Sequence, residues 1–152
     1  MSASNSVPSP VPVPVFRSRF WLGLLAVLVI AVGLASRRGW SPFPAVLGNY
    51  PGDMLWAWLV FLCVAWLRPT MARGRLAAVA LLIAFAVELL QLYQAPWIQA
   101  VRATTPGYLV LGNGFDPLDL LAYVVGVGLG AWVDAWWPWA GSRAAAGQSL
   151  QP

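Results

Sequence analysis

The sequence contains no histidine and no lysine, and it has a single cysteine among 152 residues. Without histidine, the Ser-His and Cys-His pairs of common hydrolases are excluded, and zinc or another soft metal is not expected. The lone thiol, Cys63, cannot form a disulfide within the chain. We therefore expect no metal and no cofactor, and any acid/base chemistry falls to carboxylates.

Charge is also scarce. Charged residues make up 9% of the chain and hydrophobic residues 60%, whereas a soluble domain carries about 25% charged residues. Together with long apolar runs, this deficit places the chain among membrane proteins, with the lipid bilayer as its main partner. All nine basic residues are arginines that flank the apolar runs without forming a patch, so nucleic-acid binding is not expected.

The apolar runs predict an all-α integral membrane protein, a four-helix bundle. The expected transmembrane helices span about residues 20–36, 53–67, 76–93 and 117–137. They form one domain over residues 17–140. The Pro-rich tail of residues 1–16 and the small, polar tail of residues 141–152 are expected to be disordered.

The distribution of arginine predicts the orientation in the membrane. With four helices, both termini and the turn between the second and third helices lie on one side. That side carries six arginines against one acid, Asp134, and the other carries three arginines against four acids. The positive-inside rule then makes both termini cytoplasmic. We interpret Asp134, near Arg143, as a solvated helix end.

Polar residues gather at the expected outer ends of the helices. Glu88 lies about 18 Å along the third helix at 1.5 Å per residue, past the midplane of the bilayer, and Gln91 follows on the same face. A carboxylate at this depth needs a partner, and the forked guanidinium of arginine suits that role. The predicted ligand or ion-pair cluster comprises Arg37, Arg38, Asp53, Glu88, Gln91, Arg102, Asp116 and Asp119.

Each acid has a structural interpretation beside the functional one. Asp116 precedes Pro117, a pattern that favours an N-cap over catalysis. For Asp53, capping and site membership are equally favoured. Glu88 and Asp119 are the candidate catalytic residues, although for Glu88 a structural salt bridge is slightly preferred.

Glycines suggest two further features. The Asn113-Gly114 pair predicts a turn, and residues 109–115 could form a short extended hairpin over the outer face. Gly126 and Gly130 have the spacing that lets helices approach closely. Packing within the bundle is the preferred use, and a homo-oligomer through these glycines is the alternative.

Several motifs resemble those of a family of small bacterial membrane proteins labelled as a domain of unknown function and similar to the VanZ-like family. These motifs are GDMLWA from Gly52, ELLQLY from Glu88, and LGNGFDPLDLLAY from Leu111. The resemblance implies a bacterial inner membrane as the location of this multi-pass protein. It also implies that Glu88, Arg102, Asp119 and Gly126 occupy family positions. Where VanZ-like proteins often carry an asparagine, this chain has Ala122 and Tyr123.

Three functions remain open. The first is a non-catalytic envelope protein whose charged site binds an anionic lipid, another anion, a cell-wall precursor or a partner. The second is an enzyme acting on a lipid or cell-wall precursor, with Glu88 or Asp119 as acid or base. The third is a small oligomeric transporter, which the apolar inner halves of the helices disfavour.

Overall fold

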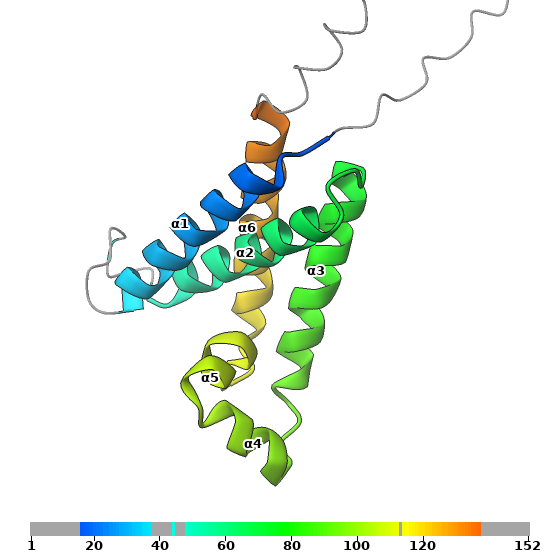
Figure 1. The fold of residues 1–152 in the computed structure, drawn as a ribbon. Coiled ribbons are helices and arrows are strands. Elements are labelled where there is room, and N and C mark those ends of the chain that lie inside the picture. The colour runs from blue at the N-terminus through cyan, green and yellow to red at the C-terminus, as the bar shows by residue number, and fades with distance from the viewer. Residues whose placement is uncertain (1–15, 38–43, 45–47, 113, 138–152) are drawn as a thin grey trace, which may run out of the picture.

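The protein is all-α in the residues that the computed structural model describes, namely 16–37, 44, 48–112 and 114–137. This part of the chain has six helices and no strands (Figure 1). The expected disordered tails lie outside it, apart from Phe16. The helices are α1 (Arg19–Arg37), α2 (Tyr50–Leu67), α3 (Arg73–Leu90), α4 (Pro96–Arg102), α5 (Thr105–Leu111) and α6 (Pro117–Trp136).

Three of the helices, α1, α2 and α6, are long and apolar enough to cross a membrane. Their outward surfaces carry large apolar side chains, among which Val27 is 63% and Leu121 64% exposed. A soluble monomer rarely exposes contiguous apolar surface on this scale. These surfaces indicate a membrane protein. The remaining long helix, α3, has 18 residues but carries Arg73, Arg75 and Glu88.

Helix α2 is the centre of the packing, because it contacts α1, α3 and α6. Helices α3 and α6 also pack against each other, and α1 lies alongside α2 (Figure 1). Among the described side chains of α1, only Leu22 and Val29 are buried. The compact core is therefore formed by α2, α3 and α6, with α1 added on one side, rather than by four equivalent helices.

Helix α3 buries a single stripe with one residue per turn: Leu76, Ala80, Ala84 and Glu88. The four-residue spacing keeps these side chains on one face of the helix. Small residues within the stripe let neighbouring helices approach, as is common in membranes. Glu88 is therefore the polar end of the face that packs against α2 and α6.

Helix α6 has a matching stripe, in which Gly126 and Gly130 face α2. A Cβ atom on Gly126 would lie 2.1 Å from the Met54 carbonyl oxygen. On Gly130 it would lie 2.9 Å from Cδ1 of Trp58. The two glycines thus bring α2 and α6 together within one chain. This packing occupies the face that a homo-oligomer through these glycines would need, so the expected alternative is not supported.

Gly126→Ala is expected to destabilise the protein by about 1–3 kcal/mol, the range for an overpacked core, because the backbone of α2 must move. Gly130→Ala should cost less, since its nearest neighbours are side-chain atoms. Gly128→Ala is the matched control, because nothing lies within 4 Å of its Cβ position. Denaturant unfolding in detergent measures all three. Equal stability of the Gly126 and Gly128 variants would contradict the close contact.

The segment between α3 and α6 differs from the expectation. Residues 109–111 belong to helix α5, so the predicted extended hairpin was wrong. Pro96 starts α4, and the Thr104 hydroxyl caps α5 by accepting a hydrogen bond from the Gly107 nitrogen at 3.1 Å. Each of these helices has only seven residues, too few to show a clear periodicity. They lie together beyond the ends of α3 and α6 (Figure 1).

Candidate functional site

Buried polar side chains form two groups at opposite ends of the packed helices. In the described part of the chain, Arg17 and Asp134 are buried at one end, and Glu88, Gln91 and Arg102 at the other. An apolar core of residues from α1, α2, α3 and α6 lies between them. Each group must satisfy its own hydrogen bonds, because no water is available inside such a core.

The Glu88 carboxylate is fully buried and accepts three hydrogen bonds. The Tyr123 hydroxyl donates to Oε2 at 2.6 Å, and the Gln91 side-chain amide donates to the same oxygen at 2.9 Å. The Asp116 backbone nitrogen donates to Oε1 at 2.9 Å. Glu88 therefore joins the end of α3 to the beginning of α6 through neutral donors.

Gln91 extends this network into the chain that precedes α6. Its Oε1 atom accepts a hydrogen bond from the Gly114 nitrogen at 2.8 Å. At Gly112 the backbone has a φ of 64°, in the left-handed region that favours glycine. A Cβ atom there would lie 2.7 Å from the Gln91 amide nitrogen. Gly112 is thus required both by its conformation and by the approach of Gln91.

The two aspartates of the α6 N-terminus have different environments. Asp116 is the N-cap, and its Oδ1 accepts a hydrogen bond from the Leu118 nitrogen at 2.9 Å. Asp119 is half-buried, and its side chain has no hydrogen bond within the described part of the chain. It lies close enough to Glu88 and Asp116 for the charges to repel. Asp53 also lies within electrostatic range of Tyr123.

Arg102 was predicted to pair with these carboxylates, and this prediction was wrong. Its guanidinium donates instead to two carbonyl oxygens, that of Leu90 at 2.8 Å and that of Tyr93 at 3.0 Å. Among the described residues it forms no ion pair, and its Nε atom is buried without a partner. The terminal carbonyl groups of a helix carry partial negative charge, so Arg102 stabilises the end of α3.

The remaining predicted arginines give no site geometry. Arg37 is the last residue of α1. Its side chain, like all of Arg38, lies outside the part of the chain that the structure describes. Among the described side chains, the structure therefore brings together Glu88, Gln91, Asp116 and Asp119, and Arg102 forms no ion pair with them.

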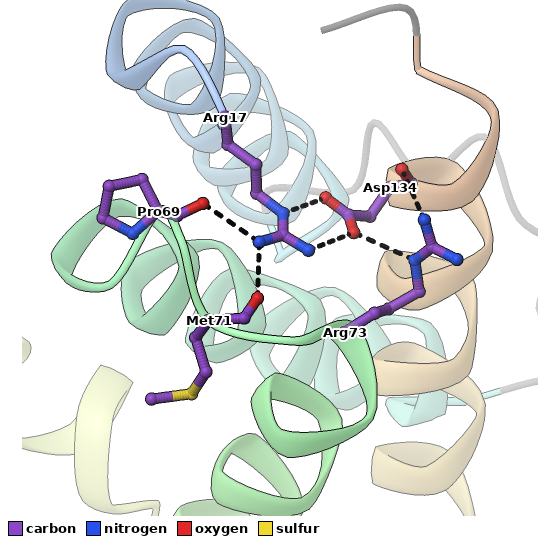
Figure 2. A network of polar contacts seen from close by, with 5 residues as sticks. All are labelled: Arg17, Pro69, Met71, Arg73 and Asp134. Atoms are coloured by element: carbon purple, nitrogen blue, oxygen red, sulfur yellow. Dashed lines mark hydrogen bonds and ion pairs between the residues drawn. The ribbon is translucent and has the colours of Figure 1, made fainter. Parts of the chain in front are cut away.

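The second polar group corrects the interpretation of Asp134 as a solvated helix end. Asp134 is only 4% exposed, and the guanidinium of Arg17 binds both of its carboxylate oxygens, at 2.5 and 2.7 Å (Figure 2). Arg73 donates to Oδ2 of Asp134 at 3.0 Å. Arg17 also donates to the carbonyl oxygens of Pro69 at 3.1 Å and Met71 at 2.7 Å. One arginine thus ties the start of α1, the α2–α3 turn and the end of α6 together.

A signal for this network was present in the sequence. Asp134 follows Gly126 and Gly130 at intervals of four residues, which places all three on one face of α6. A buried carboxylate needs buried hydrogen-bond donors or a buried cation. Arg17 lies at the start of the first apolar run, and this end of the run was expected on the same side of the membrane as the C-terminal end of the last predicted helix. Sequence reasoning used the glycine spacing for packing and did not extend it to Asp134.

The geometry limits the chemistry available at the Glu88 end. No group of three or more metal-ligating side chains occurs among the described residues. Glu88 is inaccessible and already holds three donors, so it acts as a structural acceptor. Asp119 is the accessible carboxylate of the pair, and it can accept hydrogen bonds or a proton from a bound molecule.

Comparison with known proteins places the chain in a family. No solved structure matches the chain. A family model described as a protein of unknown function, DUF2809, matches residues 43–127, which is more than half of the chain. The matched segment includes Glu88, Arg102 and Asp119 and excludes Arg17 and Asp134. The expected membership of an uncharacterised family is thereby confirmed: this chain belongs to the DUF2809 family of proteins of unknown function.

Proposed function

We propose that this protein spans a bacterial inner membrane four times, with both termini in the cytoplasm. Helix α3 is the fourth span, because its charges lie near its ends: Arg73 and Arg75 in the first turn and Glu88 in the last. Arginine near a helix end extends its side chain towards the interface, and Glu88 has buried donors. The excess of arginine at the end that contains the α2–α3 turn supports its cytoplasmic location.

A reporter fusion tests this orientation. A reporter that is active only in the periplasm, fused after Gly114, is expected to be active, because this position precedes α6 at the proposed outer end. The same reporter fused after Thr70, in the α2–α3 turn, is the matched control and is expected to be inactive. The reverse pattern would overturn the proposed orientation.

At the outer end, we propose a site that binds the headgroup of an envelope lipid or cell-wall precursor through Asp119. The observation that carries this proposal is the half-exposed carboxylate of Asp119, which has no hydrogen bond in the described chain and lies beside the buried Glu88. A carboxylate accepts from N–H and O–H donors. The ligand is therefore a headgroup with amine or hydroxyl donors. A free anion is less suited, because Arg102 already donates to the carbonyl oxygens of Leu90 and Tyr93.

Retention of two phospholipids tests the role of Asp119. Phosphatidylethanolamine offers N–H donors, and phosphatidylcholine with the same acyl chains offers none. The full chain in mild detergent is expected to retain the first in preference, as measured by native mass spectrometry. Asp119→Asn should reduce this preference by about tenfold, the loss of one charge-assisted hydrogen bond. Asp119→Glu should keep it, and equal retention of the two lipids by the wild type would contradict the proposed site.

An enzyme that acts on such a lipid is the second candidate. Two nearby carboxylates in different environments are a common arrangement for acid/base work, and the half-buried Asp119 would be the acid or base. A transporter is disfavoured, because the buried polar groups of the described chain lie at its two ends with an apolar core between them. We also propose that the protein is related to VanZ-like proteins, because Glu88 and Asp119 match positions that those proteins share.

A further inference from the structure

We propose that the end of the molecule opposite Asp119 is a binding surface for anionic phospholipids. The surface, which we call the basic surface, consists of Arg19, Arg68, Arg73 and Arg75. All four side chains are exposed, and they surround the α2–α3 turn. Its ligand is the phosphate headgroup of a phospholipid in the adjacent leaflet. This inference rests on the membrane location proposed above and concerns a different site.

The placement of these arginines follows from printed contacts. The Arg19 guanidinium lies 5.5 Å from the centre of the Trp66 ring, near the end of α2. Arg68 is the next residue but one and forms the C-cap of α2. Arg73 and Arg75 lie in the first helical turn of α3, directly after the α2–α3 turn. The four side chains therefore belong to one end of three adjacent helices.

Charge at this end is only partly neutralised. Asp134 is the one acid there in the described chain, and the buried Arg17 binds both of its oxygens. Arg73 shares an oxygen of Asp134, but its own side chain is 42% exposed. Arg19, Arg68 and Arg75 have no carboxylate partner among the described residues. Arginine forms paired hydrogen bonds with phosphate, so an anionic headgroup complements this excess.

The surroundings suit a lipid rather than a soluble phosphate. Exposed apolar side chains adjoin the arginines and can contact acyl chains; they are Phe20, Trp21, Trp66 and Leu67. Basic residues at a membrane surface attract anionic lipids. The turn is also held in place, because Arg17 donates to the carbonyl oxygens of Pro69 and Met71 (Figure 2). A fixed turn loses little conformational entropy when a headgroup binds.

Lipid retention by arginine variants tests the inference. The full chain is reconstituted in vesicles of phosphatidylcholine and phosphatidylglycerol and extracted, and the bound lipids are counted by native mass spectrometry. The wild type is expected to be enriched in phosphatidylglycerol. The variant R19Q/R68Q/R75Q should lose this enrichment, by about fivefold for each arginine neutralised. Arg73 is left unchanged, because it also contacts Asp134.

Matched variants separate this site from the others. The variant R19K/R68K/R75K keeps the charge and should keep most of the enrichment. Inorganic phosphate at the same concentration should not displace the lipid. Asp119→Asn should leave the phosphatidylglycerol enrichment unchanged, whereas failure of the protein to enter vesicles would contradict the membrane location itself. Unchanged enrichment in R19Q/R68Q/R75Q, or displacement by inorganic phosphate, would overturn the inference.

Discussion

Asp134→Ala is expected to destabilise the protein by about 3–5 kcal/mol, the range for breaking a buried ion pair by removing one partner. The Arg17 and Asp134 side chains are 0% and 2% exposed, so little water can replace the lost carboxylate. Arg17 would keep its bonds to Pro69 and Met71, but its charge would be buried without a counter-ion. Denaturant unfolding of the full chain in detergent measures the loss.

Arg73→Gln is the matched control for this prediction. It removes another contact to the same carboxylate, but from a side chain that is 42% exposed. Solvent screening reduces the value of such a pair to about 1 kcal/mol or less. If the Asp134 and Arg73 variants unfolded at the same denaturant concentration, the buried pair with Arg17 would not be the main support of this end. If Asp134→Ala were as stable as the wild type, the stabilising role of the buried Arg17–Asp134 pair would be contradicted.

The all-helical fold and the apolar spans followed from the sequence because both depend on local patterns. These patterns involve only residues within a few helical turns of one another. They are the long apolar runs, Pro117 at the start of α6 and the capping Asp116. The two short helices α4 and α5 were not predicted, because seven residues are too few to show a helical periodicity. Local patterns thus predicted the long helices but not the structure of the segment between α3 and α6.

The partners of the polar residues depended on the tertiary structure. Charge alone suggested that Arg102 pairs with Glu88, yet Glu88 is satisfied by Tyr123, Gln91 and the Asp116 nitrogen. A buried carboxylate can use neutral donors as well as cations. Which donors it uses depends on where α3 and α6 cross. No spacing within one helix gives that information.

The two polar groups fix the register of helices that the apolar core alone would not prevent from shifting along one another. Lipid chains are as apolar as leucine side chains, so burying apolar surface does little to hold helices in register within a membrane. Arg17 and Asp134 fix one end of α6, and Glu88 fixes the other end through Tyr123 and the Asp116 nitrogen. The helix is therefore held at both ends. This arrangement also keeps Asp119, one turn after Asp116, in a constant position.

Glu88→Ala is expected to be strongly destabilising, because it leaves two buried donors, Gln91 and Tyr123, and the part-buried Asp116 nitrogen without an acceptor. Each unsatisfied donor costs about 1–3 kcal/mol, although the three need not add. Glu88→Gln should be milder. Its single carbonyl oxygen can face either Asp116 or Tyr123, so at least one donor meets an amide N–H group. Denaturant unfolding in detergent is expected to show that the wild type is the most stable, Glu88→Gln less stable and Glu88→Ala the least stable. A Glu88→Gln variant as stable as the wild type would contradict the structural role.

Tyr123→Phe in two backgrounds isolates the shortest of these bonds. In the wild type it removes a hydrogen bond to a charged group and should cost about 1.5–3 kcal/mol. In Glu88→Ala the Tyr123 hydroxyl is already unsatisfied and the residue is only 4% exposed. Removing the hydroxyl there should be neutral or stabilising, so the cost seen in the wild type disappears or changes sign. The same cost in both backgrounds would mean that Tyr123 and Glu88 act independently. A cost that disappears or changes sign identifies the buried carboxylate as the acceptor that joins α3 to α6.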